Sequence, residues 1–204
     1  MPDYLSIGSN RDHLLIPMNL PTALEIAGQL GCLLPTRKMV DQIFRQSAFH
    51  FLPQPLPAGD RMRSTAYYLK HNQMIGEQQR SSGCPLGALV SGHKKDVVLT
   101  NRLARSAGKI AIYGWHRLSG LPIQPLSTVH GAGYVDYSHG IRLVSEIVLI
   151  NGKPWSILDV LENPKLAAVI NDEGPIPWIK KFLVLSSEVK DRFLISRRFR
   201  HFSE

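Results

Sequence analysis

The chain has 204 residues, of which 44% are hydrophobic and 20% charged, the proportions of an ordinary globular protein and not of a disordered or fibrous one. A chain of this length buries about 70% of its unfolded surface, so we expect a sizeable core without disulfides or metal. The net charge of +8 favours anionic partners, while two cysteines exclude a disulfide-rich framework and no apolar run is long enough to span a membrane.

The first part of the chain predicts helices. Pro21-Thr22 opens a helical pattern that Gly31 can end. Pro35-Thr36 starts a second helix with an apolar face, so the two should form a helical hairpin. Residues 51–60 hold three prolines and are predicted to be a linker or wrapping loop. A third helix is expected over about residues 62–79.

After Gly83 the pattern becomes extended. Four segments rich in β-branched and aromatic residues predict consecutive antiparallel strands: residues 96–100, 109–115, 134–137 and 141–150. Asn151-Gly152 is a strong hairpin signal, so the last of these strands should turn back at once. Residues 156–170 then predict a helix that is broken near Pro164.

Helices followed by strands predict an α+β fold, with an N-terminal helical segment at about 20–80, an antiparallel sheet at about 85–155 and a C-terminal helix. We expect one domain over residues 1–177. Residues 178–204 form a basic tail or helix with seven Lys or Arg against three Asp or Glu. Their bases and aromatics could bind single-stranded nucleic acid, but a solvated chain end is the ordinary interpretation, and nucleic acid is not the expected partner.

Histidines indicate where the function lies. Four of the eight fall between residues 93 and 139: His93, His116, His130 and His139. Because the imidazole titrates near neutral pH, these rings together with Asp136, Ser138 and Arg142 supply parts for proton transfer, nucleophile activation or metal binding.

The same four histidines predict a metal site as one hypothesis. Zinc in enzymes commonly has three protein ligands, and adjacent strands could gather His93, His116, His130 and His139 around a divalent ion such as zinc. No HExxH, H-x-H or CxxC spacing supports this, so the alternative is that each ring lies separately at a strand end. The cofactor therefore stays unknown.

Two serine patterns predict a nucleophile. Ser138 in the sequence YSHG is similar to the nucleophile elbow of hydrolases, although Asp136 stands where that motif has glycine and a strand follows where it needs a helix. Ser91 and Lys94 form an S-x-x-K pattern, but Gly92 and the following strand disfavour the helix that this pairing requires. The alternatives are a turn at Ser138 and a polar loop at residues 91–96.

Residues 21–36 are similar to papain-like cell-wall peptidases, in which a cysteine starts a helix and a histidine comes from the sheet. The chain departs from this pattern because its helix begins at Pro21-Thr22 and Cys32 follows its end, where no helix dipole lowers a thiol pKa. Cys84, which precedes His93, is the better thiol candidate, and a plain loop cysteine is the alternative.

These patterns lead us to expect a hydrolase acting on an amide, ester or glycosidic bond of a polymer, such as a cell-wall or polysaccharide chain, or of a small anionic substrate. His116 or His139 would be the general base or a metal ligand, and Arg142 an anion or oxyanion partner. Asp136 would be the carboxylate that orients a histidine or that itself acts in acid–base catalysis. A non-catalytic module that binds glycan or polyanion is the alternative. The start of the chain does not follow the plan of a signal peptide, so export with the leader removed and a cytoplasmic location both stay open.

Overall fold

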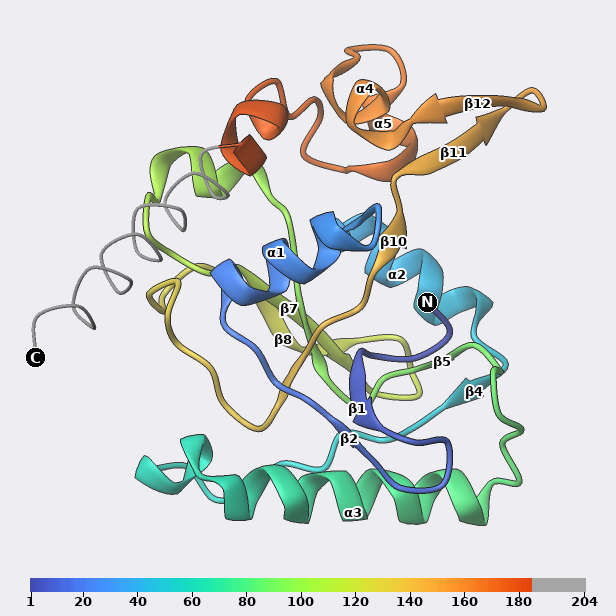
Figure 1. Cartoon of the computed structure of the whole chain (residues 1–204), viewed down its shortest axis with the longest axis vertical. Coiled ribbons are helices and arrows are strands. Elements are labelled where there is room, and N and C mark those ends of the chain that lie inside the picture. Colours follow the sequence, from blue (N-terminus) through green and yellow to red (C-terminus); the bar gives the residue numbers. More distant parts are fainter. Residues whose placement is uncertain (185–204) are drawn as a thin grey trace, which may run out of the picture.

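The computed structural model describes residues 1–184 and has the expected α+β class. Its centre is a four-stranded sheet in the order β8-β7-β6-β9 (Figure 1). The strands are β6 (Lys95–Val97), β7 (Ile112–His116), β8 (Pro122–Ser127) and β9 (His139–Gly140). β6 and β7 confirm the strands predicted over residues 96–100 and 109–115.

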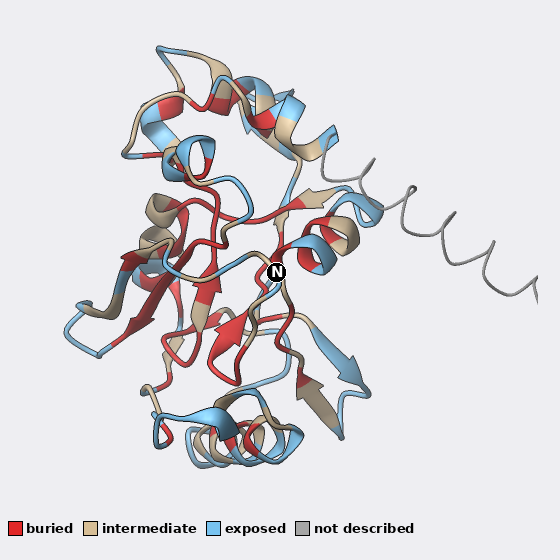
Figure 2. Cartoon of the chain, turned by 90° about the vertical axis from the view of Figure 1, so that its left-hand side faces the viewer, coloured by how far each residue is buried: buried red, intermediate tan, exposed pale blue. Residues whose placement is uncertain are grey.

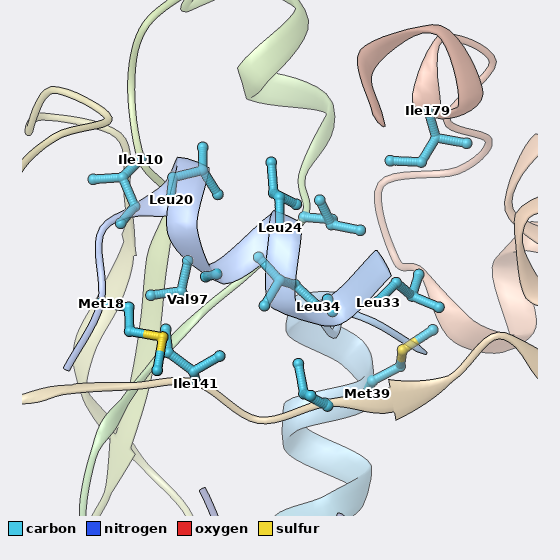
Figure 3. Packing of buried hydrophobic residues seen from close by; sticks show 14 of the residues in the cluster. Met18, Leu20, Leu24, Leu33, Leu34, Met39, Val97, Ile110, Ile141 and Ile179 are labelled. Carbon is cyan, nitrogen blue, oxygen red and sulfur yellow. The ribbon is translucent and has the colours of Figure 1, made fainter. Parts of the chain in front are cut away.

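Two capped helices enclose this sheet. Asn19 caps α1 (Leu20–Gln29) by accepting from the Thr22 amide, and Thr36 caps α2 (Arg37–Gln46) by accepting from the Met39 amide. Alternate strand residues point to opposite faces, and the hydrophobic clusters follow this alternation. Val97 and Ile112 pack with α1, whereas Val98, Ala111 and Tyr113 pack with Val40 of α2 (Figure 3 shows the α1 side).

The third predicted helix is present as α3 (Thr65–Ser81), preceded by a short 3-10 turn, η1 (Asp60–Arg63). It lies apart from α1 and α2, below the sheet in Figure 1. Tyr67, His71 and Ile75 recur every four residues and form its buried side, while its other residues are exposed or half-buried (Figure 2). Tyr67 packs against Trp115 and Tyr137, which ties α3 to one end of β7.

The predicted strand over residues 134–137 is wrong. These residues form a loop in which Tyr134 bonds back to Gly131 and Tyr137 to Met62. β9 follows this loop and pairs parallel with β6, so the prediction of consecutive antiparallel strands also fails here. β8 was not predicted because it contains Pro122 and Pro125, and proline disfavours strands. Proline is tolerated there because β8 is the edge strand of the sheet.

The helical hairpin is interrupted. Between α1 and α2 the chain forms β3 (Cys32–Leu33), which pairs with β10 (Val144–Ser145). Two further pairs mix strands into the helical half: β1 (Ser6–Gly8) with β2 (His13–Leu15), and β4 (Phe49–His50) with β5 (Val90–Ser91). Helices and strands are therefore not separated along the chain as expected.

The strand predicted over residues 141–150 is divided: residues 141–143 lie outside any strand, and β10 and the following strand are separated at Glu146 and pair with different partners. The predicted hairpin and broken helix after it are confirmed. β11 (Ile147–Ile150) and β12 (Lys153–Ser156) form a hairpin whose turn residues, Asn151 and Gly152, have φ of 51° and 76°. The following helix is broken around Pro164 into α4 (Ile157–Glu162) and α5 (Ala167–Ile170). Most of the basic tail lies outside the described residues, so the boundary at residue 177 stays a prediction. Within residues 1–184, no helix is long and apolar enough to cross a membrane.

Candidate functional site

Two residues of β7 with positive φ, Gly114 and Trp115, determine where His116 points. Strict alternation from Tyr113 would place His116 on the α1 side of the sheet. The pairing with β8 shifts between Ile112 and Gly114, and Gly114 and Trp115 have φ of 106° and 57°. The extra residue of this shift lies in β8, because three steps from Ser127 to Gln124 match two steps from Ile112 to Gly114. The alternation in β7 is therefore reversed by the left-handed conformations of Gly114 and Trp115. His116 therefore lies on the α2 side with Tyr113.

The ring of His116 is held by α2. Its Nε2 lies 3.1 Å from Oδ1 of Asp41, and the hydroxyl of Tyr113 donates to the same oxygen over 2.8 Å. Phe44 stacks on the imidazole with ring centres 4.8 Å apart. Burial raises the pKa of the Asp41 carboxyl, but the hydrogen bonds from His116 and Tyr113 outweigh it, and the pKa is lowered overall. Asp41 is thus an ionised acceptor that fixes Nε2–H on His116.

These residues surround an open pocket of about 440 Å³. It is lined by Asp41, Phe44, Arg45, His50, Tyr113, His116, Leu118, Ser119 and Gly120. Nε2 of His50 lies 2.8 Å from the carbonyl oxygen of Phe44, which can only accept. The hydrogen of neutral His50 is therefore on Nε2, and its Nδ1 keeps a lone pair. Two imidazoles with defined tautomers and one carboxylate meet in this pocket.

Asp96, Tyr4 and Arg142 form a buried ionic network on the side of His116 that faces Gly114. A Cβ at Gly114 would be 3.3 Å from Asp96 Oδ2 and 3.5 Å from His116 Nδ1, so glycine leaves the space where the two groups approach. Tyr4 donates to Asp96 over 2.9 Å, and Nε of Arg142 is 3.7 Å from its other oxygen. Burial raises the pKa of Asp96 to about 6 despite the opposing charge of Arg142.

Arg142 is not placed to stabilise an oxyanion. Its side chain is 1% exposed, and its guanidinium donates to the carbonyl oxygens of Met1, Pro2 and Val90. Since these bonds and Asp96 occupy the guanidinium, Arg142 ties the beginning of the chain to the sheet. The predicted oxyanion role is corrected to a structural one.

The predicted Asp136, Ser138 and His139 form a second cluster, on the α1 side of the sheet. Asp136 accepts from the amide and the hydroxyl of Ser138, over 2.8 and 2.5 Å, and from Tyr134 over 3.0 Å. Ser138 is fully buried and donates its proton to a carboxylate, so it is not arranged as a nucleophile. His139 lies 3.9 Å from Asp136 with no hydrogen bond to either ring nitrogen, and burial lowers its pKa to about 4.

The four histidines predicted as metal ligands are not gathered around one point. Nε2 of His93 pairs with Asp3 at 3.0 Å, His116 pairs with Asp41, and His130 stacks on Tyr134 with ring centres 3.9 Å apart. Among residues 1–184, no group of three or more His, Cys, Asp or Glu is arranged to hold a metal ion. The arrangement thus gives no support to the zinc hypothesis.

The other nucleophile patterns are also explained by burial. Ser91 and Lys94 lie on β5 and the turn before β6, not on a helix, and the Lys94 ammonium donates to the carbonyl oxygen of Tyr137 over 2.7 Å. Burial lowers the pKa of Lys94 to about 7. Cys32 and Cys84 are both free, and burial raises the pKa of the Cys84 thiol, which is the opposite of activation.

Sequence reasoning found His116 but missed its partners Asp41, Arg45 and His50. No spacing motif connects α2 with β7, and the Asp41–His116 bond joins residues 75 positions apart. One available signal was Asp41 itself, a carboxylate in a helix whose neighbouring face is apolar.

Comparison with models of protein families, with curated proteins and with solved structures finds no match to this chain. A function therefore has to be inferred from the arrangement of its side chains. On that basis the pocket between α2 and the end of β7 is the candidate active site, and the Asp136–His139 cluster is a buried polar network.

Proposed function

We propose that the chain is a hydrolase whose acid–base centre is the pocket between α2 and β7. One observation carries the proposal: His116 is hydrogen-bonded to the ionised Asp41 at a 440 Å³ pocket that also contains His50. An open pocket with convergent titratable groups is the usual setting of an active site. The orienting carboxylate is then Asp41, where the sequence had suggested Asp136.

The two imidazoles suit different parts of a hydrolysis. His50 donates Nε2–H to the Phe44 carbonyl, so its Nδ1 can accept the proton of a water molecule as the water attacks and then return that proton to the leaving group. His116 donates Nε2–H to Asp41 and has its Nδ1 on the side of Gly114, so its role is to hold the Asp41 carboxylate in place. Phe44 contacts both rings and holds them on one side of the pocket.

This chemistry fits amide, ester and glycosidic bonds, since each is cleaved by adding water with one proton removed and one delivered. No serine or cysteine nucleophile is needed. The competing hypothesis, a module that binds glycan or polyanion without turnover, uses the same pocket and differs only in the absence of product.

The test is turnover of a panel of chromogenic esters, peptides and glycosides by the wild type, Asp41→Asn, His50→Asn and His139→Asn, with His13→Asn on β2 as the control. Asp41→Asn keeps the shape of a partly exposed side chain, so thermal unfolding should show that the variant folds. We expect kcat/KM to fall roughly 10²–10⁴-fold in the two pocket variants and not in the control.

Full activity of both pocket variants would overturn the proposal. Loss confined to His139→Asn would instead place the centre at the Asp136–His139 cluster. A wild type that binds these compounds but releases no product would favour the binding module.

A further inference from the structure

The pocket of the proposed function contains a guanidinium that no carboxylate neutralises. Arg45 is exposed in the last turn of α2 and belongs to the pocket lining. Within residues 1–184, no Asp or Glu oxygen lies within 4.0 Å of it, and it makes no hydrogen bond. Its charge is therefore directed at the pocket and the solvent.

The acidic residue of the lining does not cancel this charge. Oδ1 of Asp41 already accepts from Tyr113 and His116, so that carboxylate is committed to the imidazole. Arg45 acts on Asp41 only as a more distant charge, which contributes to the lowered pKa of the Asp41 carboxyl. The pocket thus keeps one uncommitted cation beside two histidines.

The rest of the lining limits what such a ligand can be. Phe44 and Leu118 provide apolar surface, and Leu118 is 64% exposed in the turn between β7 and β8. A volume of about 440 Å³ suits a small molecule or one unit of a polymer. The net charge of +8 adds a general attraction for anions.

We propose that the substrate carries an oxyanion, a carboxylate or a phosphate, which Arg45 binds while the apolar part lies against Phe44 and Leu118. Guanidinium is suited to this because its planar donors match the two oxygens of such a group. The inference rests on the proposed function and specifies the substrate class of the same pocket, with Arg45 as a specificity residue.

The test measures binding without turnover, so that it can fail independently of the hydrolase proposal. Inorganic phosphate and acetate are titrated at constant ionic strength into the wild type, Arg45→Gln and Arg45→Lys, and the His50 and His116 ring resonances are followed by NMR. The control is Arg105→Gln, an exposed arginine in η2 (Asn101–Arg105), before the opposite end of β7, with the same change in charge.

We expect phosphate or acetate to shift the resonances of both rings in the wild type and the control. Arg45→Gln should weaken this binding roughly tenfold or more, and Arg45→Lys less, since lysine keeps the charge but not the planar donors. Equal affinities in Arg45→Gln and Arg105→Gln, or rings that do not respond, would overturn the inference. Weakened anion binding in Arg45→Gln, together with full turnover by Asp41→Asn and His50→Asn, would show that Arg45 binds anions in this pocket but that hydrolysis takes place elsewhere.

Discussion

Lowering the pH should destabilise the fold because two histidines are buried as neutral rings. His71 and His139 are 0% exposed, and among the described residues none of their ring nitrogens has a hydrogen-bond partner. Burial lowers the pKa of His71 to about 2 and that of His139 to about 4, against 6.5 for an unperturbed ring. The unfolded chain therefore binds protons that the folded chain does not, so stability that is present above pH 6.5 is lost as the pH falls.

The magnitude follows from these shifts. One proton of difference changes the free energy of unfolding by about 1.4 kcal/mol per pH unit. Between pH 6.5 and 5 both rings stay neutral in the folded chain while the unfolded rings go from half to nearly full protonation, so each should cost roughly 1.6 kcal/mol. Asp96 acts in the opposite direction, because burial raises its pKa to about 6 from 3.8 and the folded chain binds that proton first. It offsets a little over 1 kcal/mol, which leaves a net loss of roughly 2 kcal/mol.

Urea unfolding followed by circular dichroism at several pH values between 7 and 5 measures this loss. We compare how steeply the free energy of unfolding of each variant and of the wild type changes with pH. The slope is compared and not the free energy itself, because each substitution also changes packing at every pH. His71→Asn and His139→Asn should each reduce the slope by an amount that grows as the pH falls and approaches about 1.4 kcal/mol per pH unit near pH 5. His13→Asn removes a half-buried ring and is the control. If all three variants keep the wild-type slope, burial of neutral imidazoles is not the source of acid sensitivity.

Two glycines give further predictions. A Cβ at Gly140 would lie 2.6 Å from Cδ1 of Tyr4 and 2.7 Å from Cβ of Lys94. Gly140→Ala should therefore lower the free energy of unfolding by roughly 1–3 kcal/mol, as measured by urea unfolding. The control is Gly133→Ala, which has no atom within 4 Å of its Cβ and should change stability by less than about 0.5 kcal/mol. Equal losses in the two variants would contradict the close packing at Gly140. Gly114→Ala places a Cβ 3.4 Å from the His116 ring at a φ of +106°, so it should displace that ring, and unchanged His116 resonances would contradict this.

Local signals explain what the sequence could predict of the fold. Helix caps and tight turns involve residues only a few positions apart, as at Asn19, Thr36 and Asn151-Gly152. The helices and the hairpin between β11 and β12 can therefore be predicted from short stretches of sequence. The pairing of β3 with β10 and of β6 with β9 involves only two residues in each strand. Such short, distant pairs leave no periodic pattern, which is why the sheet order could not be predicted.

The same distinction applies to the candidate site. A high density of histidine and aspartate identifies where polar chemistry is concentrated but not which groups face solvent. Asp136 and His139 are as rich in titratable chemistry as Asp41 and His116, yet Asp136 is 2% exposed and His139 0%, whereas the Asp41 side chain is 27% exposed. Exposure depends on what packs around each side chain: Asp41 lies on α2 at the open pocket, whereas Asp136 lies in a loop that the tertiary structure buries.

The left-handed segment Gly114-Trp115 of β7 connects the fold with the proposed function. In a regular extended conformation, the alternation of the strand would direct Trp115 toward α2 and His116 toward the side occupied by Lys95 and His139. With the left-handed segment, the Trp115 ring lies 5.0 Å from the Lys95 ammonium, and His116 reaches Asp41. The left-handed conformation of Trp115 is unusual for a bulky residue, and conformations of this kind cluster at functional sites because the surrounding structure must enforce them. Burial of Trp115 against α3 provides that enforcement, so α3 contributes to the pocket from the other side of the sheet.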